Sequence, residues 1–117
     1  MNIETLRTYS LNKLGATESF PFGNDTLVFK VGNKVFLLSS LDNPISFNAK
    51  CNPEKAIILR ENHPEIIPGF HMNKKHWNTI YYNGNLPEKL LEEMIDDSYK
   101  LVFDSLPKAL QQEIKTI

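Results

Sequence analysis

The chain has 117 residues, and its 13 lysines and arginines oppose 14 aspartates and glutamates, for a net charge of −1. The hydrophobic fraction of 41% excludes a disordered or fibrous chain, and the length fits one domain over residues 1–117. Near-neutral charge excludes a protein that coats nucleic acid with its whole surface, so any contact with phosphate has to be local.

Cys51 is the only cysteine, which excludes an intramolecular disulfide and a cysteine-based zinc site and fits a reducing compartment. The first residues lack the basic segment and apolar run of a secretory signal. No stretch approaches the ~18 apolar residues of a membrane span. We therefore expect a protein of the bacterial cytoplasm with no membrane contact.

The N-terminal part predicts one helix followed by a sheet. Apolar residues at helical spacing indicate a helix over residues 2–14, which Gly15 ends. The aromatic and proline residues at 20–23 predict a buried extended segment.

Alternating apolar and polar residues then predict a three-stranded antiparallel meander over residues 27–31, 34–40 and 45–51. Gly32-Asn33 is typical of a two-residue hairpin turn, and residues 42–44 predict the next turn.

Asn52 and Pro53 are typical of a helix start, and the helix is expected to end near Asn62. Residues 64–75 show no clear period and predict a long loop before a further strand at 77–82.

Pro87 is expected to open the longest helix, which keeps one apolar stripe and an acidic opposite face. Pro107 breaks this helix, and residues 108–115 predict a short terminal helix. This order predicts an α+β fold, with N- and C-terminal helices on one face of the sheet and the other face open to water.

The charge is unevenly distributed along the chain. Residues 30–77 carry a net charge of +3 and residues 78–117 carry −3. Strand parity places Lys30 and Lys50 on the polar sheet face, and Lys34 lies at the hairpin tip. These lysines either serve solubility or form a patch for phosphates, and the sequence leaves both open.

Residues 71–78 combine amine and amide donors, two imidazoles and one indole, which together can hold a sugar–phosphate backbone and stack on a base. In the competing interpretation Trp77 anchors the core, and Thr79 and Tyr81 line the covered face with it. Lys74 and Lys75 belong to a polar loop in both interpretations.

No catalytic, metal or cofactor site is expected. The five-residue step from His71 to His76 matches no usual metal-ligand spacing, and the isolated glycines form no phosphate-binding loop. Cys51 is in phase with apolar residues and is expected to be a buried thiol. We therefore predict a protein that is not an enzyme and has no cofactor.

Several segments resemble the MmcQ/YjbR family in order and spacing, across nearly the whole chain. The most specific runs from Pro68 to Asn78 and reads PGFHMNKKHWN. The others are the segments FPFG at 20–23, TLVFKVG at 26–32, LD at 41–42, KCNPE at 50–54, LP at 86–87 and SY at 98–99.

The resemblance implies a small bacterial protein with a frataxin-like (CyaY-like) α+β fold and a double-wing DNA-binding surface. On this chain the wings would be the hairpin at 31–34 and the segment 71–78. Arg7 and Arg60 are the only arginines, and the sequence places neither in this surface, so bidentate guanine recognition is not expected.

Two functional hypotheses follow. The first is weak, largely sequence-independent binding of DNA by a protein that is expected to be a monomer. The second is a non-enzymatic adaptor that binds a protein or a small anionic ligand in a cleft of the loop 63–77. The residues for DNA are Lys30, Lys34, Lys50, Asn73, Lys74, Lys75, His76 and Asn78, and those for the ligand are His71, Asn73, Lys75 and Trp77.

Overall fold

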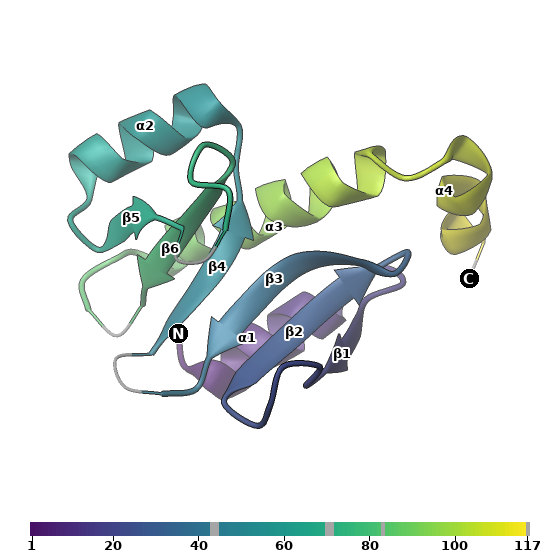
Figure 1. Ribbon diagram of the computed structural model, residues 1–117, viewed down its shortest axis with the longest axis horizontal. Helices are drawn as coiled ribbons and strands as arrows, with labels where there is room; N and C mark the ends of the chain where they lie inside the picture. Colours follow the sequence, from purple (N-terminus) through teal and green to yellow (C-terminus); the bar gives the residue numbers. More distant parts are fainter. Residues whose placement is uncertain (43–44, 70–71, 83, 117) are drawn as a thin grey trace.

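The computed structural model describes residues 1–42, 45–69, 72–82 and 84–116, which form four α-helices and one six-stranded antiparallel sheet (Figure 1). Of the sequence predictions, His71 and parts of the turns at 42–44 and 83–85 lie outside these residues. The elements are α1 (Ile3–Leu11), β1 (Thr17–Ser19), β2 (Thr26–Val31), β3 (Lys34–Ser40), β4 (Ser46–Lys50), α2 (Pro53–Asn62), β5 (Ile66–Pro68), β6 (Trp77–Tyr81), α3 (Glu88–Asp104) and α4 (Lys108–Lys115).

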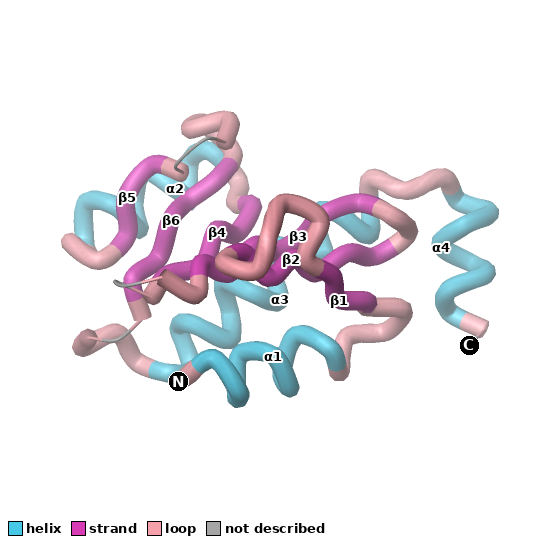
Figure 2. Tube along the Cα trace, turned by 60° about the horizontal axis from the view of Figure 1, so that its bottom comes forward, coloured by secondary structure: helices cyan, strands magenta, loops and turns pink. Residues whose placement is uncertain are grey.

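The strand order is β1-β2-β3-β4-β6-β5, with every neighbouring pair antiparallel. The predicted meander is therefore confirmed as β2-β3-β4, and the later strand joins it beside β4. Helices α1 and α3 lie together on one side of the strands (Figure 2). The α+β fold with one helix-covered face is confirmed.

The register assigns each strand residue to one of the two faces, because directly paired residues share a face. Phe29, Leu37, Phe47 and Ile80 lie on the helix-covered face and have no solvent exposure. Burial of each such side chain contributes roughly 1.5–3 kcal/mol to folding. These side chains form the core with the inner stripe of α3.

The sequence missed β1 and β5, each of three residues, because such short segments show no measurable alternation. The loop predicted at 64–75 therefore contains a strand that pairs with β6. The first helix ends at Leu11, three residues earlier than expected. The segment at 20–23 is not buried as expected, since Phe20 is 48% and Phe22 69% exposed.

A bulge in β3 and one serine of α3 separate the two halves of the sheet. The β2–β3 register shifts between Phe29 and Lys30, and the β3–β4 pairing ends at Leu37. Beyond that point the fully buried Ser98 hydroxyl donates to the Phe36 carbonyl (2.5 Å) and accepts from the Lys50 amide (2.7 Å). The serine thus replaces one direct bond between strands, and β3 and β4 diverge from there (Figure 1).

Helix α4 lies at the far end of the molecule beside the tip of the β2–β3 hairpin (Figures 1 and 2). Gly32 at this tip has a φ of +55°, and a Cβ there would lie 2.6 Å from the Leu106 side chain. The tip is therefore held against the α3–α4 connection. No helix among the described residues is long and apolar enough to cross a membrane.

Candidate nucleic-acid interface

The strand face opposite α1 and α3, here called the open face, carries no acidic side chain on β2, β3, β4, β5 or β6. Its register row across the middle of the sheet joins Val28, Leu38, Asn48, Thr79 and Ile67. This row is not fully exposed to solvent, because Val28 has no solvent exposure and Thr79 is 2% exposed. The charged side chains of these strands lie nearer the strand ends.

Lys30 and Lys50 both lie on the open face, as strand parity predicted. Lys30 pairs with Val35, and Lys50 pairs with Trp77. Strands β2 and β4 both lie beside β3 and run in the same direction. Each lysine is near the C-terminal end of its strand and is partly exposed. They therefore point from the same side and the same end of the sheet.

The other three candidate lysines belong to this end as well. Lys34 begins β3, and Lys74 and Lys75 lie in the turn directly before β6. All three are exposed. We call the set Lys30, Lys34, Lys50, Lys74 and Lys75 the lysine end.

The lysine end consists of two groups rather than one cluster. Lys30 and Lys34 belong to the β2–β3 hairpin near α4, whereas Lys50, Lys74 and Lys75 belong to β4, β6 and the turn between β5 and β6. The strands diverge between them (Figure 1). Lys34 also pairs with the buried Val31, so the register places Lys34 on the helix-covered face rather than on the open face.

No carboxylate of the described residues forms an ion pair with a lysine of this set. The lysines that do pair belong to helices or to the segment that follows α1: Lys13 bonds to Asp96, and Lys55 bonds to Glu93 (2.9 Å) and Asp97 (2.6 Å). These bonds raise the pKa of Lys55 above its ordinary value, the bond to Asp97 having the largest effect. The ammonium groups of the lysine end thus retain their capacity to bind an anion.

Carboxylates gather at the opposite end of the sheet. Asp25 directly precedes β2, and its carbonyl accepts from the amide of Leu41 (2.8 Å), the residue that follows β3 and precedes Asp42. The carbonyl of Glu65 accepts from the Tyr81 amide at the end of β6 (3.0 Å). These three carboxylates and the lysine end therefore lie at opposite ends of the sheet, which orients an approaching polyanion, and Glu18 of β1, which pairs with Phe29 near Lys30, is bonded to Arg7.

The turn before β6 has a defined backbone. The Asn73 carbonyl accepts from the amides of His76 (3.1 Å) and Trp77 (2.9 Å), and its side-chain oxygen accepts from the Lys75 amide (3.0 Å). The Lys74 ammonium donates to the Gly69 carbonyl (3.3 Å). Asn73 thus shapes the turn that presents the two lysines, and its side-chain oxygen is engaged within it.

Arg60 is a positioning residue that the sequence did not place here. From α2 its guanidinium donates to the Lys74 carbonyl, the Trp77 carbonyl (3.2 Å) and the Asn78 side-chain oxygen (2.7 Å). Its Nε and one of its two terminal nitrogens are thereby used within the protein. The only signal in the sequence was its place near the end of the predicted helix.

Asn78 does not belong to the exposed donor set, which corrects the sequence prediction. It is 1% exposed and pairs with Ala49 on the covered face, since it alternates with Trp77 on β6. The same parity corrects the competing interpretation, because Trp77, Thr79 and Tyr81 lie on the open face rather than the covered one. His76 is partly exposed, and its carbonyl accepts from the Cys51 amide (2.7 Å).

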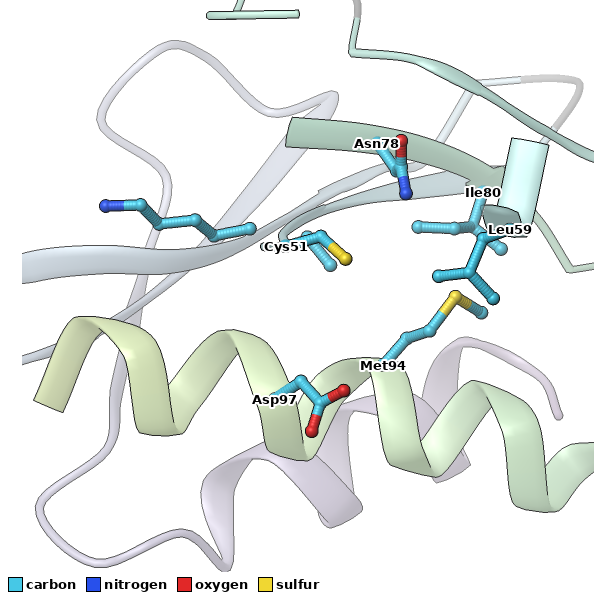
Figure 3. Close-up of a pocket in the computed structure, with 8 residues that line it drawn as sticks. Cys51, Leu59, Asn78, Ile80, Met94 and Asp97 are labelled. Atoms are coloured by element: carbon cyan, nitrogen blue, oxygen red, sulfur yellow. The ribbon is translucent and has the colours of Figure 1, made fainter. Parts of the chain in front are cut away.

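Cys51 and Asn78 line a small cavity between β4, α2 and α3, with Met94 and Asp97 on its other side (Figure 3). Its volume is about 10 Å³, close to the space that one water molecule needs and far below that of a metabolite. The thiol is buried as predicted, and burial raises the pKa of Cys51. This cavity offers no site for the small ligand of the second hypothesis.

The comparisons with known proteins cover almost the whole chain. The family model YjbR matches residues 11–101. The chain belongs to the YjbR family.

Two relatives from Escherichia coli are the uncharacterised proteins YbdF and YjbR. YbdF of strain O157:H7 is 39% identical over 96% of this chain and 93% of its own length. YjbR of strain K12 is 32% identical over 92% of each chain.

The fold is shared with a crystal structure of the Deinococcus radiodurans protein DR2400, described as a DUF419 domain. It is 36% identical to this chain, with a TM-score of 0.92, and the match covers 97% of this chain and 88% of that one. A Pseudomonas syringae protein of solved structure is 28% identical, with a TM-score of 0.77 over 87% of this chain and 99% of its own. These relatives establish family and fold.

Proposed function

We propose that this member of the YjbR family binds nucleic acid through the lysine end, by contacts to phosphates, and acts by binding rather than by catalysis. The observation that carries the proposal is the separation of charge along the sheet. Five lysines that have no carboxylate partner among the described residues lie at one end, and Asp25, Asp42 and Glu65 lie at the other.

The binding is expected to be weak and largely independent of sequence. Both arginines are engaged within the protein: Arg7 bonds to Glu18, and Arg60 bonds to the turn before β6. Because both guanidinium groups are engaged in this way, bidentate recognition of guanine is not expected. Ammonium groups contact phosphates as point charges, which favours affinity without sequence selection.

Fluorescence anisotropy with labelled oligonucleotides across a series of salt concentrations tests the proposal. Each phosphate contact contributes about −0.7 to −0.9 to the slope of log affinity against log salt. The double variant Lys74→Ala/Lys75→Ala is expected to weaken binding and to reduce the magnitude of the slope by about 1.4 to 1.8.

The matched control is Lys89→Ala/Lys100→Ala, which removes the same charge from α3. Lys100 pairs with Asp104 one helical turn away, and both lysines are exposed. The control is expected to retain the affinity and the slope of the unmodified protein. Equal losses in both double variants, or binding that does not respond to salt, would refute the proposal.

A further inference from the structure

Helices α2 and α3 offer no basic surface that could enter the groove of a duplex. On α2, Lys55 is paired with two carboxylates of α3, and Arg60 is bonded to the turn before β6. The exposed positions between them are Ile57 and Ile58, which are 53% and 55% exposed. Since α3 carries an acidic outer face, α2 and α3 both lack the cations that hold a recognition helix in the major groove.

The β2–β3 hairpin is not a free wing either. A Cβ at Gly32 would lie 2.6 Å from Leu106 and 3.2 Å from Leu110, so the tip packs against the connection to α4. Val31, directly before the tip, has no solvent exposure. A hairpin held in this way cannot enter a groove without losing these contacts.

Trp77 lies where the second group of lysines meets the open face. It pairs with Lys50 in the β4–β6 register and directly follows the turn that carries Lys74 and Lys75. Its side chain is partly exposed. The arrangement places an indole beside three amines, which is the combination that single-strand-binding proteins use for bases and phosphates.

The backbone under Trp77 is fixed from three sides. Its carbonyl accepts from the Gly69 amide (2.9 Å) and from Arg60 (3.2 Å), and its amide donates to the Asn73 carbonyl (2.9 Å). A larger residue does not fit at position 69, because a Cβ on Gly69 would lie 2.9 Å from the Cβ of Trp77. The backbone that carries the ring therefore loses little freedom when a base stacks on the indole.

We propose that this site takes single-stranded nucleic acid, with a base stacked on Trp77 and phosphates bound by Lys50, Lys74 and Lys75. The inference rests on the proposed function and names its substrate class. A single strand suits the site because its bases are free to stack, whereas the bases of a duplex are stacked on one another. The bond from Lys74 to Gly69 uses one of three ammonium hydrogens and leaves two for phosphate.

Trp77 is the only tryptophan, so its own fluorescence reports on the site in the unmodified protein. Titration with oligo-dT, with oligo-U and with a duplex of equal length, each followed by tryptophan emission and by anisotropy, tests the inference. We expect both single strands to quench the emission with the same midpoint as the anisotropy, and to bind more tightly than the duplex.

Trp77→Leu is expected to weaken single-strand binding by about 5-fold to 150-fold, the range for loss of one stacked base, with an unchanged salt slope. Trp77→Phe retains an aromatic face and is expected to restore most of the affinity. Circular dichroism of both variants checks the fold, and the emission titration does not depend on either variant.

The outcomes separate the two proposals. Salt-dependent binding in which the duplex is bound as tightly as the single strands, or in which emission stays constant at saturation, overturns the single-strand inference and leaves the proposed function in place. Absence of salt-dependent binding to all three probes overturns both.

Discussion

Replacing Ser98 by alanine removes the hydroxyl that joins β3 to β4 where the direct pairing of the strands has ended. The hydroxyl donates to the Phe36 carbonyl and accepts from the Lys50 amide, and the serine has no solvent exposure. The variant therefore leaves a carbonyl and an amide of the sheet without their partner. Lys50 belongs to the lysine end, so the same serine also supports the proposed binding surface.

The magnitude follows from two unpaired backbone groups. Each buried polar group that loses its partner costs about 1–3 kcal/mol. The higher helix propensity of alanine offsets roughly 0.5 kcal/mol of this loss in stability. We expect Ser98→Ala to lower the free energy of unfolding by about 1.5–5.5 kcal/mol, a large part of the 5–15 kcal/mol typical of a domain.

Urea unfolding followed by circular dichroism measures this change, and Ser10→Ala is the matched control. Ser10 is also helical and fully buried, but its hydroxyl has no hydrogen-bond partner in the part of the chain that the structure describes. Its replacement is expected to leave stability unchanged or to raise it slightly, because no bond is lost. If both variants lose less than about 1 kcal/mol, the bridging role assigned to Ser98 is wrong.

Three further expectations concern backbone geometry, thiol reactivity and pH. Gly32→Ala is expected to lower the free energy of unfolding by about 1–3 kcal/mol, because the position has a φ of +55° and no room for a Cβ. Gly84→Ala is the control and should be near neutral in the same urea assay, because a Cβ there would make only ordinary contacts. Cys51 is expected to react with a thiol reagent far more slowly in the native than in the urea-unfolded protein, because burial limits access and raises the pKa of the thiol; equal rates would contradict this. The bond to Arg7 lowers the pKa of Glu18, so the stabilisation from this pair is present above the pKa of Glu18 in the unfolded chain and is lost as pH falls through the folded value. An NMR titration should place the Glu18 midpoint below the ordinary ~4.3 and return it toward that value in Arg7→Gln, and an unchanged midpoint would count against the pair.

Much of the candidate interface was accessible to sequence reasoning, because strand parity is a local property. Alternation with Phe29 and Ala49 on their own strands placed Lys30 and Lys50 on the open face, and the register agrees. The same reasoning failed at Asn78, which was chosen for its chemistry while its parity was left aside. Donor chemistry identifies a group that can bind phosphate, but only burial decides whether phosphate can reach it.

Arg60 has a role that the sequence could not reveal. Its guanidinium holds the turn before β6 from another element, 14 to 18 residues earlier in the chain. A sequence shows a cation near a helix end, and the usual inference is a solvent-exposed charge. Its partners are backbone carbonyls and one amide, which leave no charge pattern to recognise.

The sequence by itself determined the α+β class, the meander, the buried thiol and the uneven charge, because periodicity, turn chemistry and composition act over a few residues. The tertiary structure alone decided where the sheet divides, which lysines share a group and that the hairpin tip is held by α4. Those features depend on contacts between distant residues, such as Ser98 with Phe36 and Gly32 with Leu106. Such contacts exist only once the chain has folded, since neither partner carries a local signal of the other.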